Sequence, residues 1–124
     1  MKDKAIMNQV EIATISILRK LEIPQHLSGY PYIKTAVRLL VEKPDFIRRV
    51  TRELYPAIAN EHNTTSARVE RSIRHAARDH ANLEAMKSLL HFQGEKISNS
   101  HFLAALAEAV MLLMATESFK KEEV

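Results

Sequence analysis

The sequence contains no cysteine and no tryptophan, and only two glycines and four prolines among its 124 residues. Without cysteine, the chain cannot form disulfides, thiolate-ligated zinc sites or a thiol nucleophile, which fits a reducing compartment. The two glycines, Gly29 and Gly94, stand alone, so there is no glycine-rich phosphate-binding loop. The residues that dominate instead, such as Ala, Leu, Ile, Glu, Lys and Arg, favour helices over a sheet.

Long apolar runs and a strong excess of one charge are also missing. The longest apolar run, Phe102–Ala115, contains Glu108 and is too short to span a bilayer. Polar residues interrupt the N-terminal segment, so we expect no signal peptide. The net charge of +3 permits a polyanionic partner, but only if the basic residues cluster on one face. We therefore expect a soluble, cytoplasmic protein that does not contact a membrane.

Apolar residues recur at helical spacing along most of the chain. The pattern predicts an all-α fold, a single compact bundle of about six helices containing a helix-turn-helix. We place one domain at residues 1–118 and a flexible tail at 119–124. The expected helices cover about 6–22, 31–43, 45–54, 56–62, 66–79, 82–91 and 99–117, the fourth being a short segment. Gly94 is the expected stop after the helix at 82–91, and Asn99 or Ser100 is the expected cap of the last helix.

Residues 55–79 have the spacing of a helix-turn-helix. Ala59 is small and lies where the second helix must approach the first closely. Asn63 follows four residues later, at the position that needs an unusual turn conformation, and asparagine tolerates positive φ. Val69 comes six residues after Asn63, on the inner face of the second helix. Thr64 or Thr65 can cap that helix.

The predicted second helix, at about 66–79, has two distinct faces. Val69, Ile73 and Ala76 share the inner face, and Ala67, Arg71, Arg74 and Arg78 share the opposite one. Such a helix can enter a DNA major groove, because arginine can bridge guanine O6 and N7 and glutamate can accept from cytosine N4. Thr64, Thr65 and Ser66 can donate to phosphates at its N-terminus. A merely solvated face fits the periodicity equally well, and Glu70 and Arg74 form an ordinary i, i+4 pair.

Three stretches of the sequence resemble a known family. They are LYPAIANEHNTTSARVERSIRHAARD (Leu54–Asp79), LEIPQHLSGYPYIKTAV (Leu21–Val37) and SNSHFLAALAEAV (Ser98–Val110). They are similar to the C-terminal effector domain of the sporulation stage-zero response regulator, the master transcription factor of endospore formers. The similarity covers about residues 10 to 115. It implies a six-helix domain that binds a short DNA box in the major groove, with head-to-tail pairs on tandem boxes and a contact with the sigma subunit of RNA polymerase.

The resemblance also implies roles for individual residues. Glu70, Arg71 and Arg74 match base-reading positions, and Thr64, Thr65, Ser66, Arg68 and His75 match positions at or near the DNA backbone. We add Arg78, at the end of the same outward face, to the expected backbone contacts. The family's regulator carries an N-terminal receiver domain that this chain lacks, so we expect either an excised domain or a free-standing relative.

We therefore predict a sequence-specific, double-stranded DNA-binding transcription regulator that is not an enzyme and needs no cofactor. The alternative is a helical protein-interaction module without DNA readout, since the strongly apolar last helix could offer a docking surface. A metal site is disfavoured because the six histidines are scattered and no HExxH motif is present. His75 and Asp79 are four residues apart, but we expect His75 and His80 to lie on different faces of their helix.

Overall fold

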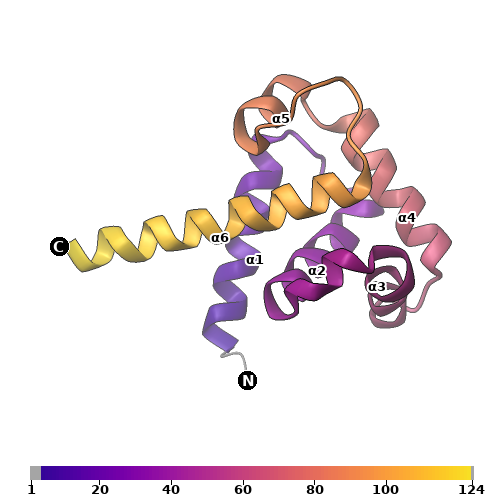
Figure 1. Cartoon of the computed structure of the whole chain (residues 1–124), viewed down its shortest axis with the longest axis horizontal. Coiled ribbons are helices and arrows are strands. Elements are labelled where there is room, and N and C mark those ends of the chain that lie inside the picture. The colour runs from indigo at the N-terminus through magenta and orange to yellow at the C-terminus, as the bar shows by residue number, and fades with distance from the viewer. Residues whose placement is uncertain (1–3, 124) are drawn as a thin grey trace.

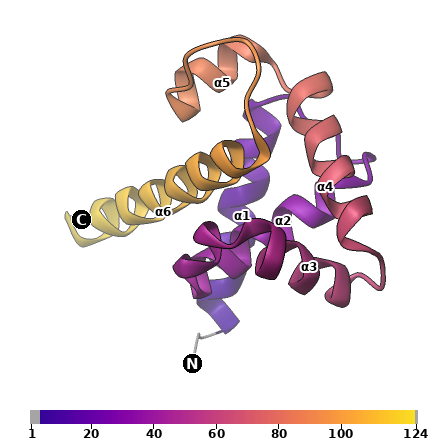
Figure 2. The same cartoon turned by 45° about the vertical axis from the view of Figure 1, so that its right-hand side comes forward.

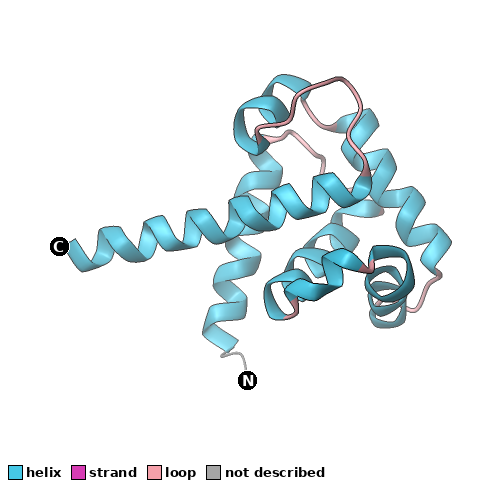
Figure 3. Ribbon diagram, in the orientation of Figure 1, coloured by secondary structure: helices cyan, strands magenta, loops and turns pink. Residues whose placement is uncertain are grey.

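The computed structural model describes the backbone of residues 4–123 and the side chains of residues 4–117. This part of the chain is helical and contains no strand, which confirms the predicted all-α bundle of six helices (Figures 1 and 3). The α-helices are α1 (Lys4–Lys20), α2 (Gly29–Glu42), α3 (Tyr55–Glu61), α4 (Ser66–His75), α5 (Leu83–Leu90) and α6 (Asn99–Glu123). Three short helical turns complete the set, η1 (Pro44–Arg48), η2 (Val50–Leu54) and η3 (Ala76–His80).

The core forms where α1, α2, α4 and α6 meet. α6 packs against α1 and α2, and α2 packs against α4. Fully buried aliphatic and aromatic side chains from these helices fill the centre, among them Leu18, Ile33, Val37, Ile73, Phe102 and Leu106. Burying side chains of this size is the main stabilising term of such a bundle.

Gly29 lets the N-terminus of α2 approach α4 closely. A Cβ atom at this position would lie 2.3 Å from the backbone oxygen of Ser72, which is far inside the contact distance. The hydroxyls of Ser28 and Ser72 are joined by a hydrogen bond of 3.1 Å beside this contact. The position of α4 is therefore fixed by a backbone approach that only glycine permits.

The prediction of a single helix at 45–54 is wrong. Residues 44–48 form the 3₁₀ turn η1, and Arg49 then leaves the helical region with φ −136° and ψ 50°. The chain resumes as the π-helical turn η2, in which the Leu54 N–H bonds to the Arg49 carbonyl, and continues directly into α3. Two irregular turns satisfy the backbone here with i→i+3 and i→i+5 bonds, which apolar spacing alone does not reveal.

Three helix ends also differ from their predicted positions. α1 ends at Lys20 rather than near residue 22, and Glu22 just beyond it has φ 62°. α5 stops at His91, which adopts the left-handed conformation with φ 54°, so Gly94 is not the stop. α6 is capped by Ser98, whose Oγ accepts a hydrogen bond of 3.1 Å from the His101 N–H, rather than by Asn99 or Ser100.

α6 is longer than the sequence predicted, because it continues to Glu123 instead of ending near Glu117. Its C-terminal turns extend past the other helices (Figures 1 and 2). The side chains of the predicted tail at 119–124 lie outside the described residues. By length and composition the segment Asn99–Glu117 could cross a membrane, with a mean hydropathy of 1.3. It nevertheless supplies Phe102, Leu106 and Val110 to the core, as a central helix of a bundle does.

Candidate nucleic-acid interface

The helices α3 and α4 form the predicted helix-turn-helix. Asn63 has φ 55°, as expected for the turn, and the Thr64 N–H bonds to the Ala59 carbonyl at 2.9 Å. Thr65 is the cap of α4, since its hydroxyl accepts a hydrogen bond of 3.2 Å from the Arg68 N–H. The sequence had left Thr64 and Thr65 as alternatives for this cap.

Contacts behind α3 hold the motif on the rest of the bundle. The Thr35 hydroxyl on α2 lies 2.7 Å from His62 Nε2 at the end of α3. The Arg38 guanidinium, also on α2, pairs with the carboxylate of Glu61. These contacts orient α3 and the turn that follows it.

The two faces of α4 differ as the sequence predicted. Val69, Ile73 and Ala76 are completely buried against the bundle. On the other side, Ala67, Arg68 and Arg71 are exposed. The buried side fixes the orientation of the helix, so its charged side must face outward.

The three predicted base-contacting residues lie together on this outer side. The Arg71 side chain is exposed and makes no hydrogen bond or ion pair within the described part of the chain. The Arg74 guanidinium pairs with the Glu70 carboxylate one turn earlier, and both side chains are partly exposed, at 39% and 37%. Arg71 is therefore free to accept a partner, whereas Arg74 and Glu70 present a paired cation and anion.

The predicted backbone-contacting residues fall into two groups. Thr64, Thr65, Ser66 and Arg68 lie around the N-terminus of α4. His75 and Arg78 lie at its other end, where α4 continues into η3. Arg78 is already engaged, because its Nε donates to the carbonyl of Ile97 at 3.1 Å, in the loop that precedes α6.

Sequence reasoning missed a brace behind the outer face of α4. The buried Asn99 side chain, at the start of α6, donates to the Tyr55 hydroxyl and to the Glu70 carbonyl, both at 3.0 Å. Burial raises the pKa of the Tyr55 hydroxyl above its ordinary value of 10.0, so tyrosine stays neutral here. The brace joins α3, α4 and α6 across more than 40 positions of sequence, and no local pattern signals such a contact.

The prediction that His75 and His80 lie on different faces is wrong. The Ala81 N–H bonds to the Ala76 carbonyl, so η3 is a π-helical turn with i→i+5 geometry. In this geometry residues five apart are neighbours. The two Nε2 atoms are 3.1 Å apart, and the rings meet edge to face with centroids separated by 4.6 Å.

In a comparison with known protein families, the chain matches the family described as sporulation initiation factor Spo0A C terminal over residues 14–110. The chain belongs to this family. The Spo0A C-terminal family consists of DNA-binding regulatory domains that act in transcription and sporulation, and it is not an enzyme family. The match includes the helix-turn-helix and every residue of the outer face of α4.

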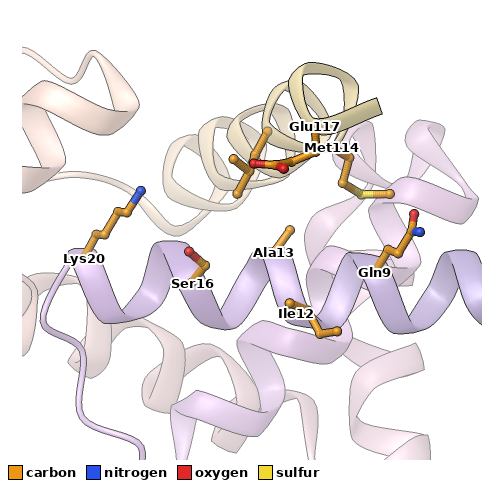
Figure 4. Close-up of a pocket in the computed structure, with 8 residues that line it drawn as sticks. Gln9, Ile12, Ala13, Ser16, Lys20, Met114 and Glu117 are labelled. Carbon is orange, nitrogen blue, oxygen red and sulfur yellow. The ribbon is translucent and has the colours of Figure 1, made fainter. Parts of the chain in front are cut away.

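A hollow away from α4 lies between α1 and α6. It measures about 410 Å³ and is lined by Ile12, Ala13 and Ser16 of α1 together with Leu113 and Met114 of α6 (Figure 4). Ile12 is 68% exposed beside it. Most of these residues fall outside the stretch that matches the Spo0A C-terminal family, and none of them belongs to α4. The hollow is thus separate from the helix-turn-helix.

Proposed function

We propose that the chain is a sequence-specific, double-stranded DNA-binding domain whose helix α4 lies in the major groove, and that it regulates transcription in the cytoplasm. The observation that carries this proposal is the arrangement on α4. A completely buried back fixes the helix, and an exposed Arg71, which has no partner among the described residues, stands beside the paired Glu70 and Arg74. Membership of a DNA-binding family supports the same conclusion.

Arg71 and Arg74 are the proposed guanine readers, and Glu70 is proposed to accept from a cytosine amino group. The Glu70–Arg74 pair does not stand in the way, because an exposed i, i+4 ion pair contributes only about 0.3–0.5 kcal/mol. A bidentate contact with the correct base contributes about 1–3 kcal/mol of discrimination. The pair can therefore rearrange on DNA at little cost, and without DNA it keeps both side chains ordered.

The N-terminal end of α4 is the proposed anchor on the phosphate backbone. The hydroxyls of Thr64, Thr65 and Ser66 and the N–H groups of Thr65 and Ser66 lie at a helix N-terminus, which favours bound phosphate. Arg68 is exposed at this end and has no side-chain partner among the described residues. These contacts would fix the register of α4 on the duplex, while Arg71 and Arg74 read the bases. His75 and Arg78 would hold the backbone at the opposite end of the helix.

The decisive experiment compares two arginines that carry the same charge. A preferred duplex is first selected from a random library, and binding to it and to a scrambled duplex is then measured at two salt concentrations. We expect Arg71→Ala to lose about 1–3 kcal/mol on the selected duplex and to relax the preference at one base pair. Arg19 is an exposed arginine on α1, and Arg19→Ala makes an equal change of charge away from α4. This variant should keep the preference for the selected duplex.

Two further results would distinguish the roles of the residues. Arg68→Ala should weaken binding to all duplexes and reduce the salt slope by about 1, as expected for a phosphate contact. Equal loss on the selected and the scrambled duplex in Arg71→Ala would reduce Arg71 to a phosphate contact. Absence of binding to any duplex would favour a protein-interaction module instead.

The contacts with the sigma subunit of RNA polymerase and the head-to-tail pairing on tandem sites rest on the family resemblance alone. Both are tested by the same selected duplex. Two copies of the site in tandem should bind two chains with an affinity that depends on the spacing between the copies, and a purified sigma subunit should bind the resulting complex.

A further inference from the structure

The pair His75 and His80 has a geometry that the DNA-binding function does not require. We propose that these two histidines bind a divalent transition-metal ion, with Asp79 as the residue that orients His75. Their Nε2 atoms are 3.1 Å apart. Two imidazole nitrogens bound to one tetrahedral Zn²⁺ at about 2.0–2.1 Å are separated by about 3.3 Å. The two rings are therefore already at the spacing of neighbouring metal ligands.

The contact between Asp79 and His75 sets the tautomer of the neutral His75 ring. His75 Nδ1 lies 2.9 Å from the Asp79 carboxylate, so Nδ1 carries the proton and donates it to the carboxylate. The lone pair of the neutral ring is then on Nε2, the atom that faces His80. A carboxylate that holds the far nitrogen of a ligating histidine is a recurring feature of metal sites, because it fixes both the tautomer and the ring orientation.

His80 can supply the second ligand after one proton shift. In the structure its Nε2 lies within hydrogen-bonding distance of His75 Nε2, and one of the two must donate. Its Nδ1 has no partner among the described residues. The proton can therefore move from Nε2 to Nδ1, whose N–H then donates a hydrogen bond to water, and the Nε2 lone pair becomes available to the metal.

The surrounding charges limit the affinity without preventing binding. Arg71, Arg74 and Arg78 line the same hollow as His75 and Asp79. Arg74 is paired with the Glu70 carboxylate. Arg78 donates to the neutral Ile97 carbonyl and Arg71 has no partner among the described residues, so both keep their positive charge. The Asp79 carboxylate offsets one of these two charges.

The protein offers two ligands rather than a closed site. No group of three or more His, Cys, Asp or Glu side chains suited to a metal is found within the described residues. Both rings are exposed, so the remaining positions of a four-coordinate ion are open to water or to another oxygen donor. Imidazole nitrogens favour ions such as Ni²⁺, Cu²⁺ and Zn²⁺ over Mg²⁺, which prefers oxygen ligands.

The test uses the full chain titrated with Zn²⁺ alone in a calorimeter, with Mg²⁺ as the hard-cation control. We expect one equivalent of Zn²⁺ to bind and Mg²⁺ not to bind. His80→Gln and His75→Ala should each weaken Zn²⁺ binding at least tenfold. Asp79→Asn should weaken it about tenfold, because it removes the acceptor that orients His75. His91→Ala, a change at an exposed histidine outside this cluster, should leave binding unchanged.

A second readout identifies the ligand atoms directly. Imidazole ¹⁵N spectra should show the Nε2 signals of His75 and His80 moving together as Zn²⁺ is added, and Asp79→Asn should alter the tautomer of His75 before any metal is present. Unchanged Zn²⁺ affinity in the double variant His75→Ala/His80→Ala would overturn the proposal. Nitrogen shifts confined to other histidines would overturn it as well.

Discussion

Two exposed parts of the molecule differ in what lies behind them. The outer face of α4 is charged, lies within residues 14–110 that match the family, and is backed by the fully buried Val69 and Ile73. The edge between α1 and α6 carries Ile12, Leu113 and Met114, which lie outside the match, and Ile12 is 68% exposed. The exposed surface is made of charged side chains in the first region and of aliphatic side chains in the second. Side-chain chemistry alone therefore does not show whether a face lies in the core or in contact with solvent.

A buried and an exposed isoleucine offer the strongest test of this difference between the two regions. Ile73→Ala should destabilise the protein by about 4 kcal/mol, because it removes a completely buried side chain and leaves a cavity behind α4. Ile12→Ala on α1 removes the same atoms from an exposed position and should change stability by less than about 0.5 kcal/mol. Urea denaturation measures both.

A large loss in Ile12→Ala would contradict the assignment of the α1–α6 edge as exposed surface. It would show that this side chain is buried in solution, by a second copy or by another partner. A concentration-dependent midpoint for the original chain, absent in Ile12→Ala, would identify a second copy as the cause.

The contact at Gly29 tests how precisely α4 is held. Gly29→Ala should cost about 3 kcal/mol, because the new Cβ would meet the rigid Ser72 carbonyl and force α2 away from α4. Ser28→Ala is the matched control, since it removes only the neighbouring hydroxyl contact and should cost less than about 1 kcal/mol. Thermal and urea unfolding report the loss, and a wild-type stability in Gly29→Ala would mean that the two helices can separate freely.

The Asn99 brace has an intermediate expected effect. Asn99→Ala should cost about 2 kcal/mol, because it leaves the buried Tyr55 hydroxyl and the Glu70 carbonyl without their donor. Ser100→Ala, next along α6 and exposed, should be nearly neutral. Combining Asn99→Ala with Tyr55→Phe should cost less than the sum of the single changes, because the second change removes the orphaned hydroxyl. Strict additivity in chemical denaturation would show that the two side chains do not interact.

The sequence predicted the two faces of α4 and the turn at Asn63 correctly because both depend on local rules. At 3.6 residues per turn, Ile73 and Arg71 fall on opposite sides of the helix, and asparagine tolerates the positive φ that the turn at Asn63 requires. The bundle of six helices followed from the same periodicity. The family resemblance named Glu70, Arg71 and Arg74, and their roles remain predictions that the DNA experiments test.

The failures of prediction arise where backbone geometry departs from the regular α-helix. η1 and η2 replaced the expected helix at 45–54, and η3 brought His75 and His80 together, because i→i+3 and i→i+5 turns shift every later side chain around the axis. The Asn99 brace was missed for a different reason. It joins residues 44 positions apart in sequence, so only the packed tertiary structure brings its partners together.

The smallest effect concerns the cap of α4. Thr65→Ala should cost about 1 kcal/mol, because the Arg68 N–H then loses its acceptor at a helix N-terminus. Thr64→Ala should cost clearly less, since Thr64 contributes a backbone bond to Ala59 that alanine keeps. Urea denaturation of the two variants, with Thr65→Ser as the substitution that restores the cap, separates the adjacent threonines. If Thr64→Ala were the costlier change, the cap of α4 would be Thr64 and the helix would start one residue earlier.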